Sequence, residues 1–220
     1  DAAKIAQLEA GVMPIYEPGL KEIVDKNVRE GRLSFTTDLP AGVKGAKAIF
    51  IAVGTPSRRG DGYADLSYVY AAAKEIAEHA DRDAVVVTKS TVPVGTGDEV
   101  ERIVREIRPN SQIAVVSNPE FLREGAAIAD FKHPDRIVIG TDDARARDVM
   151  QEAYRPLYLN NQPLLFMARR TAELTKYAAN AFLATKITFI NEIADLCEAT
   201  GANVQDVARG IGLDNRIGRK

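Results

Sequence analysis

Short, nearly continuous apolar runs alternate along the chain with segments whose apolar positions follow a helical spacing. The apolar runs are rich in β-branched residues and lie at residues 48–54, 84–90, 113–118 and 135–140. Helical patterns lie between and after them, at residues 66–80, 97–108 and 143–155. Strands that read as unbroken apolar runs are typical of sheets covered on both faces. The alternation therefore predicts an α/β fold, a parallel sheet with helices on both faces.

Two further helices are predicted before the first strand, at residues 1–11 and 20–30, with the proline-broken turn MPIYEPG between them. Toward the other end, a proline-free segment predicts one long helix from Thr171 to Thr200, closed by Gly201. At 1.5 Å per residue such a helix is about 45 Å long. Its apolar positions lie on one helix face, at Leu183, Ile187, Ile190, Ala194 and Cys197. We expect this helix to bridge domains or to pack against a partner chain.

Composition and charge narrow the class of protein. The 220 residues are 45% apolar, and 29 basic against 31 acidic side chains give a formal charge of −2. Neither a basic patch for nucleic acid nor an apolar segment of about 20 residues for a membrane is present, so we expect a soluble, cytoplasmic protein. The single cysteine excludes an internal disulfide and a Cys/His metal cluster. We expect a buried structural thiol at Cys197, and surface or turn positions for His79 and His133.

Polar turns follow three of the predicted strands. They read VGTPS (53–57), KSTVPVGTG (89–97) and SNPEFLREG (117–125). Each alone is compatible with ordinary turn chemistry. In an open parallel sheet, however, ligands bind outside the carboxyl ends of the strands, and glycines just before a helix allow a ligand to approach closely. Three such turns in succession predict a shared ligand site.

Two pairs of side chains set four residues apart are candidates for chemistry. Glu120 and Glu124 follow Pro119, which suits the first position of a helix, so both are expected on one face of its opening turn. They either act as ligand-orienting or basic carboxylates or merely favour the helix dipole. Lys176 and Asn180 on the long helix offer donors to a developing oxyanion; the alternative is a solvated lysine beside an ordinary helical asparagine.

Taken together, these motifs resemble the UDP-glucose/GDP-mannose dehydrogenase family. The resemblance extends over nearly the whole chain, through PIYEPGL (14–20), VGTPS, KSTVPVGTG and the segments 118–140, 173–201 and 212–218. It implies a Rossmann-like NAD-binding domain at residues 1–168 and a central helical dimerisation region at residues 169–220. It also implies a homodimer and a four-electron oxidation of the C6 alcohol of UDP-glucose. That oxidation would use two NAD in succession and pass through an aldehyde and a cysteine thioester.

The resemblance implies a role for each matching residue. Lys4 would reach the adenosine ribose, and Thr55 and Thr91 would line the cofactor path, with Thr91 also holding the hydrolytic water. Glu120 would act as the base for attack on the thioester, and Glu124 would lie where sugar and nicotinamide meet. The same substrate loop carries Phe121, Leu122 and Arg123. Finally, Lys176 and Asn180 would stabilise the negative oxygen of the intermediates.

Two departures from the family pattern limit what this chain does by itself. The glycine-rich phosphate turn that should precede Asp1 is absent, and the chain stops before the G-x-C-x-P-K-D segment with its nucleophilic cysteine. Cys197 does not match that segment. We therefore expect a portion of a longer enzyme that alone neither completes the reaction nor holds NAD tightly. Two alternatives stay open: a non-catalytic nucleotide-binding or dimerisation module, and a dehydrogenase for GDP-mannose or an N-acetylhexosamine nucleotide.

Overall fold

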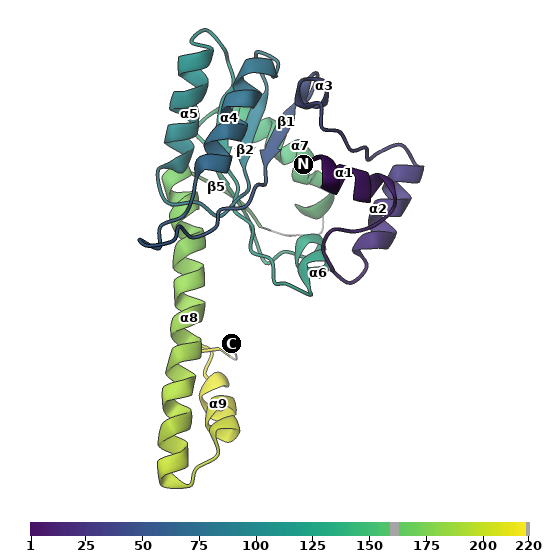
Figure 1. The fold of residues 1–220 in the computed structure, drawn as a ribbon. Coiled ribbons are helices and arrows are strands. Elements are labelled where there is room, and N and C mark those ends of the chain that lie inside the picture. The colour runs from purple at the N-terminus through teal and green to yellow at the C-terminus, as the bar shows by residue number, and fades with distance from the viewer. Residues whose placement is uncertain (159–162, 219–220) are drawn as a thin grey trace. The chain divides into compact units, whose positions relative to one another are not determined.

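The computed structural model describes residues 1–158 and 163–218, which form two compact units, Asp1–Leu174 and Thr175–Lys220. Figure 1 shows the elements along the chain. The first unit contains α1 (Ala2–Glu9), α2 (Leu20–Arg29), α3 (Leu39–Val43), β1 (Ala48–Ile51), α4 (Ser67–His79), β2 (Val85–Thr88), α5 (Thr96–Ile107), β3 (Ala114–Ser117), α6 (Ala127–Lys132), β4 (Ile137–Gly140), α7 (Ala144–Tyr158) and β5 (Leu164–Met167). Helix α8 (Arg169–Thr200) begins in the first unit and continues into the second, which also holds α9 (Val204–Gly212).

The five strands form one sheet in the order β1-β2-β3-β4-β5. Strands β1, β2 and β3 pair in parallel, as do β4 and β5, but β3 meets β4 antiparallel through Ser117 and Gly140. The predicted α/β fold with a long following helix is confirmed, and the expectation of a wholly parallel sheet is corrected at this one pairing. Strand β5 was not predicted, because its sequence LLFM is short and has no β-branched residue.

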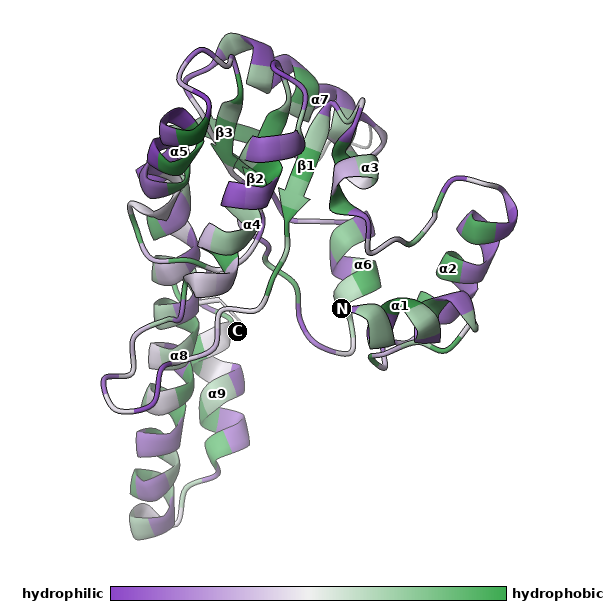
Figure 2. Cartoon of the chain, turned by 45° about the horizontal axis from the view of Figure 1, so that its top comes forward, coloured by the Kyte–Doolittle hydropathy of each residue, from purple (hydrophilic) through white to green (hydrophobic). Residues whose placement is uncertain are grey.

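Alternate side chains of the central strands enter separate cores on the two faces of the sheet. Val86 and Val115 pack with buried residues of α4 and α5, whereas Val85, Val87 and Val116 pack with α7. In Figure 2 these strands are hydrophobic along their length, while α4 and α5 carry hydrophilic positions as well. Burial on both faces is the reason that the strands read as unbroken apolar runs.

The long helix α8 begins two residues before its predicted start, within the first unit, and ends in the second unit where predicted. Cys197 is 5% exposed and its carbonyl accepts the Ala202 N–H, in agreement with a buried thiol. The Lys186 ammonium donates to the Ile217 carbonyl at 3.2 Å. The predicted apolar stripe is only partly covered, because Leu183 and Ile187 are exposed. None of the helices in the described part of the chain combines the length and hydropathy of a membrane crossing.

Candidate functional site

The carboxyl ends of the three parallel strands lie side by side, because Ile51 pairs with Thr88 and Thr88 pairs with Ser117. Two of the loops that follow are hydrogen-bonded to each other. The Thr55 hydroxyl donates to the Thr91 carbonyl at 2.9 Å, and the Ser90 hydroxyl donates to the Val53 carbonyl at 2.7 Å. Both threonines are half-buried. The structure therefore brings the VGTPS and KSTVPVGTG turns together at one edge of the sheet.

The third turn is not the start of a helix, so the prediction for Glu120 and Glu124 is wrong in its local structure. Residues 118–123 are non-helical, Glu124 lies in a turn, and α6 begins only at Ala127. The Glu120 carboxylate accepts the Leu122 N–H at 2.6 Å, which favours a turn in place of a helix. Gly125 has φ of 78°, a left-handed conformation that ends any helical path.

The other residues of this loop are held by neighbours from the following segment. The Arg136 guanidinium lies 3.9 Å from the centre of the Phe121 ring, a cation–π contact. The Arg123 guanidinium donates twice to the Asp130 carboxylate, at 2.6 and 3.0 Å. This charged contact raises the pKa of Arg123, first through the hydrogen bond to Asp130. Leu122 is 38% exposed, so it is available at the surface of the loop.

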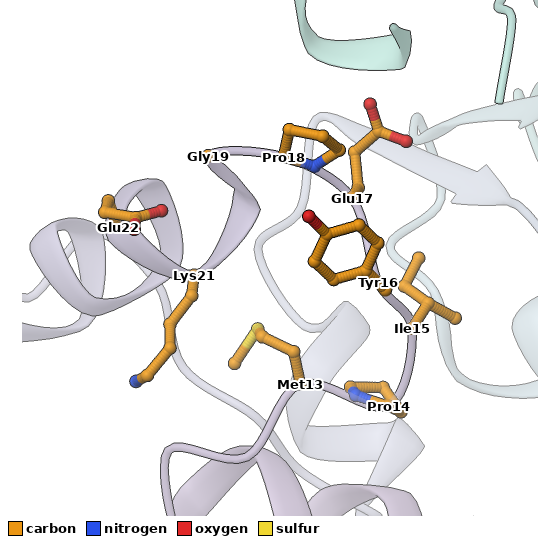
Figure 3. Close-up of a pocket in the computed structure, with 9 residues that line it drawn as sticks. All are labelled: Met13, Pro14, Ile15, Tyr16, Glu17, Pro18, Gly19, Lys21 and Glu22. Carbon is orange, nitrogen blue, oxygen red and sulfur yellow. The ribbon is translucent and has the colours of Figure 1, made fainter. Parts of the chain in front are cut away.

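The start of α6 is capped by a residue from far away in the chain. The Glu17 carboxylate accepts the Gly125 N–H at 3.0 Å and the Ala127 N–H at 2.8 Å. Glu17 belongs to the turn between α1 and α2, which lines a hollow of ≈ 480 Å³ with Met13, Pro14, Ile15, Tyr16, Pro18, Gly19, Lys21 and Glu22. Figure 3 shows the Glu17 carboxylate turned away from Met13 and Lys21. None of these lining residues is a predicted site residue.

The glycines of KSTVPVGTG do not leave a free helix end for a ligand, which corrects that expectation. The Glu173 carboxylate, from the first turns of α8, accepts the Gly95 N–H at 2.7 Å and the Gly97 N–H at 2.8 Å. It also accepts the Ser117 hydroxyl at 3.0 Å. These contacts place a carboxylate of the protein itself at the positive end of α5. Sequence reasoning missed Glu173, because it looked for a stripe of apolar residues.

A second polar cluster joins the ends of β2 and β3 to α7. The Tyr154 hydroxyl donates to the Asn118 side-chain oxygen at 2.5 Å, and the Lys89 ammonium donates to both atoms at 3.3 Å. The Asn118 amide donates to the Val138 carbonyl at 2.8 Å. Burial raises the pKa of Tyr154 to about 12, partly opposed by the hydrogen bond to Asn118. The sequence offers no signal for Tyr154, which lies on an ordinary helix.

The remaining predicted site residues lie apart from the strand-end loops in the chain. Lys4 is on α1 with an exposed side chain. Lys176 and Asn180 lie on the part of α8 that belongs to the second unit; Lys176 is 6% exposed and Asn180 is exposed. Among the described residues, no group of three or more His, Cys, Asp or Glu side chains is arranged to hold a metal ion.

Comparison with known sequences gives matches over the whole chain. Residues 1–158 match the NAD binding domain of the UDP-glucose/GDP-mannose dehydrogenase family, and residues 170–220 match the central domain of the same family. The chain is 70% identical to the UDP-glucose 6-dehydrogenase of Rhizobium meliloti (strain 1021), covering 100% of the chain and 51% of that protein. It is 52% identical to the UDP-glucose 6-dehydrogenase TuaD of Bacillus subtilis (strain 168), over 100% of this chain and 47% of that protein.

Solved structures give the same picture. A UDP-glucose dehydrogenase from the archaeon Pyrobaculum islandicum matches with a TM-score of 0.93 and 44% identity, over 100% of this chain and 51% of that one. A GDP-mannose dehydrogenase from Pseudomonas aeruginosa, solved as a ternary complex, matches with a TM-score of 0.91 and 36% identity. The match covers 97% of this chain and 50% of that one. The chain thus spans about half the length of the relatives that it matches.

Proposed function

Because the chain belongs to the UDP-glucose/GDP-mannose dehydrogenase family and carries its NAD binding domain, we propose that the protein containing it oxidises UDP-glucose to UDP-glucuronate. The high identity over the whole chain to a UDP-glucose 6-dehydrogenase carries this proposal. The oxidation converts a C6 alcohol to a carboxylate and removes four electrons. Two NAD accept them as two hydrides, and water supplies the second carboxylate oxygen.

The residues at the strand ends fit the cofactor. A side chain added at Gly54, just after β1, would meet no atom within 4 Å, so this position leaves open space beside the Thr55–Thr91 hydrogen bond. We assign Thr55 and Thr91 to the wall of this space, and Lys4 to the adenosine ribose. The start of α5 is excluded as the pyrophosphate site, because Glu173 already satisfies its N–H groups. NAD supplies, when bound, the hydride acceptor for each oxidation.

The substrate loop after β3 supplies the acid–base groups of the proposal. Glu120 removes a proton from the water that hydrolyses the thioester, and the Thr91 hydroxyl holds that water. Glu124 is proposed to lie where sugar and nicotinamide meet, with Phe121, Leu122 and Arg123 shaping the loop around the substrate. The thioester cysteine is proposed to be a different residue from Cys197, which is 5% exposed.

Lys176 and Asn180 are proposed to stabilise the negative oxygen of the intermediates. They are four residues apart on α8, so both side chains project from one helix face. An ammonium and an amide are donors, and donors aimed at a developing oxyanion are effective where water is excluded. The burial of Lys176, which is 6% exposed, is compatible with such a place.

We further propose a homodimer formed through α8, with residues 1–168 binding NAD and residues 169–220 forming the dimerisation region. The support is the group of exposed apolar side chains on this helix, Phe182, Leu183, Ile187, Phe189 and Leu196, since such surfaces are typical of interaction sites. A cytoplasmic location is part of the same proposal and rests on the sequence.

The test is turnover by the complete gene product. With UDP-glucose we expect two NADH per sugar, followed by absorbance at the nicotinamide band. Lys176→Ala should lower kcat by on the order of 10²- to 10³-fold, the usual loss for one oxyanion donor. Lys186→Ala, on the same helix, is the matched control and should stay within about threefold of wild type.

Two results would overturn the proposal. GDP-mannose or a UDP-N-acetylhexosamine used in preference to UDP-glucose would assign another nucleotide sugar, an alternative that the likeness to a GDP-mannose dehydrogenase keeps open. Absence of turnover with all of them would leave a non-catalytic nucleotide-binding or dimerisation module.

A further inference from the structure

Glu173 is a buried carboxylate to which the family resemblance gives no role. The residue is 3% exposed, and its carboxylate accepts hydrogen bonds from Gly95, Gly97 and Ser117. We propose that Glu173 is a positioning residue for the dehydrogenase reaction: it holds the loop after β2, the end of β3 and the start of α8 at one point. This inference rests on the proposed function and adds a residue to its machinery.

The fit around the carboxylate is tight. A methyl group added at Gly97 would lie 2.9 Å from the nearer Glu173 oxygen and 2.9 Å from the Ser117 hydroxyl oxygen. Real side chains do not approach so closely, so only glycine allows the carboxylate to reach the backbone here. Gly95 has φ of 96°, a left-handed conformation that suits glycine and accompanies its N–H bond to the carboxylate.

Two of the three joined segments lead directly to residues of the proposed site. Thr91 precedes Gly95 by four residues, and Glu120 follows Ser117 by three. Because only three or four residues separate these side chains from the Glu173 contact, a shift of that contact also moves the side chains. A shift of about 1 Å in a reacting group is enough to cost on the order of 10²-fold in rate.

The chemistry of the anchor explains why a carboxylate is used. Burying a charged group is costly unless hydrogen bonds compensate it, and here two backbone N–H groups and one hydroxyl do so. An apolar side chain of the same size would leave the half-buried Gly95 N–H and the buried Gly97 N–H without this acceptor. The carboxylate therefore fixes direction as well as distance, which apolar packing does not.

The experiment uses three variants of the complete gene product with UDP-glucose and NAD. Glu173→Gln replaces one carboxylate oxygen by an NH₂ group, so one of the two glycine N–H groups loses its acceptor. In Gly97→Ala the added methyl group pushes the carboxylate away. We expect each to lower kcat by on the order of 10- to 100-fold while KM values change by less than about threefold. The double variant should be no slower than the slower single variant, because both disturb one contact.

Val104→Ala is the control for lost stability, since Val104 is fully buried in α5 and its truncation destabilises the domain. Measured where all variants are folded, it should keep wild-type kcat. Hydrogen exchange at the Gly95 and Gly97 amides should speed up in Glu173→Gln and stay slow in the control. The positioning role alone is overturned if the kcat of Glu173→Gln stays within about twofold of wild type or falls no further than that of Val104→Ala. It is also overturned if the losses of kcat in Glu173→Gln and Gly97→Ala add up in the double variant. Absence of wild-type turnover overturns the proposed function and this role with it.

Discussion

The Ala127 backbone N–H donates to the Glu17 carboxylate at 2.8 Å, across 110 positions of the chain. The same carboxylate accepts the Gly125 N–H. Helix α6 is a single short element, and its own first residues supply no side-chain cap. The side-chain cap of α6 therefore comes from a distant loop, the turn between α1 and α2.

Removal of this cap should destabilise the first unit. We expect Glu17→Ala to lower the free energy of unfolding by about 1 kcal/mol, the usual cost of a lost N-terminal cap. Urea denaturation followed by circular dichroism measures it. Glu22→Ala, at an exposed position of the neighbouring helix, should change stability by less than about 0.5 kcal/mol. Equal effects of the two changes would contradict the capping role.

Gly140, at the end of β4, lies against the first turn of α8. A methyl group there would lie 2.7 Å from the Ala172 methyl carbon and 2.8 Å from the Arg169 Cα. Because backbone cannot yield easily, we expect Gly140→Ala to cost about 1–3 kcal/mol, as overpacked cores do. Gly54→Ala is the matched change, since nothing lies within 4 Å of the added methyl. Thermal unfolding should separate the two, and an unaffected Gly140→Ala protein would disprove the steric argument.

Two buried threonines should respond oppositely to replacement by valine. Within the described residues the Thr88 hydroxyl has no hydrogen-bond partner, whereas the Thr96 hydroxyl donates to the Pro93 carbonyl at 2.7 Å. Thr88→Val removes an unsatisfied polar group and should keep or raise stability, by up to about 1 kcal/mol. Thr96→Val breaks a bond and should lower stability by about 1 kcal/mol. Chemical denaturation of the pair tests this; a destabilised Thr88→Val protein would reveal a partner such as water.

Tyr154 should make stability fall at high pH. Burial raises its pKa to about 12 from the ordinary value of 10.0. The neutral phenol is thus favoured in the folded protein, and its contribution is complete below pH 10 and lost between about pH 10 and 12. The two-unit difference corresponds to about 2–3 kcal/mol. Tyr154→Phe should flatten this part of the pH profile of unfolding, whereas Tyr16→Phe, at a 91% exposed position, should not. An unchanged profile for Tyr154→Phe would refute the shift.

The sheet and its main helices could be predicted from the sequence because their signals are local. Runs such as residues 84–90 are apolar throughout, and a helix that covers a sheet repeats its apolar positions regularly. The direction in which neighbouring strands pair has no such local signal. Nothing in the sequences of β3 and β4 indicates that the two strands run in opposite directions. The missed β5 and α6 are short, and α6 depends on Glu17 for its cap.

The meeting of the polar turns at one edge of the sheet could be predicted from the sequence, but the contacts within them could not. The turns after β1, β2 and β3 are recognisable from small and polar residues, and parallel pairing places them together. In early α8, by contrast, the half-buried Arg169 is followed three, four and seven residues later by the buried Ala172, Glu173 and Lys176. Three of these four residues are charged. From the sequence alone, a helix face with so many charged residues is expected to be exposed to solvent. Only the folded structure shows the hydrogen bonds and ion pairs that these side chains make.

The carboxylate at the start of α5 also bears on how other molecules will interact with this domain. Sulfate, phosphate or a phosphorylated inhibitor would have to compete there with an anion that is covalently part of the chain and therefore always present. Crystal soaks and fragment screens should leave that helix end vacant of exogenous ions.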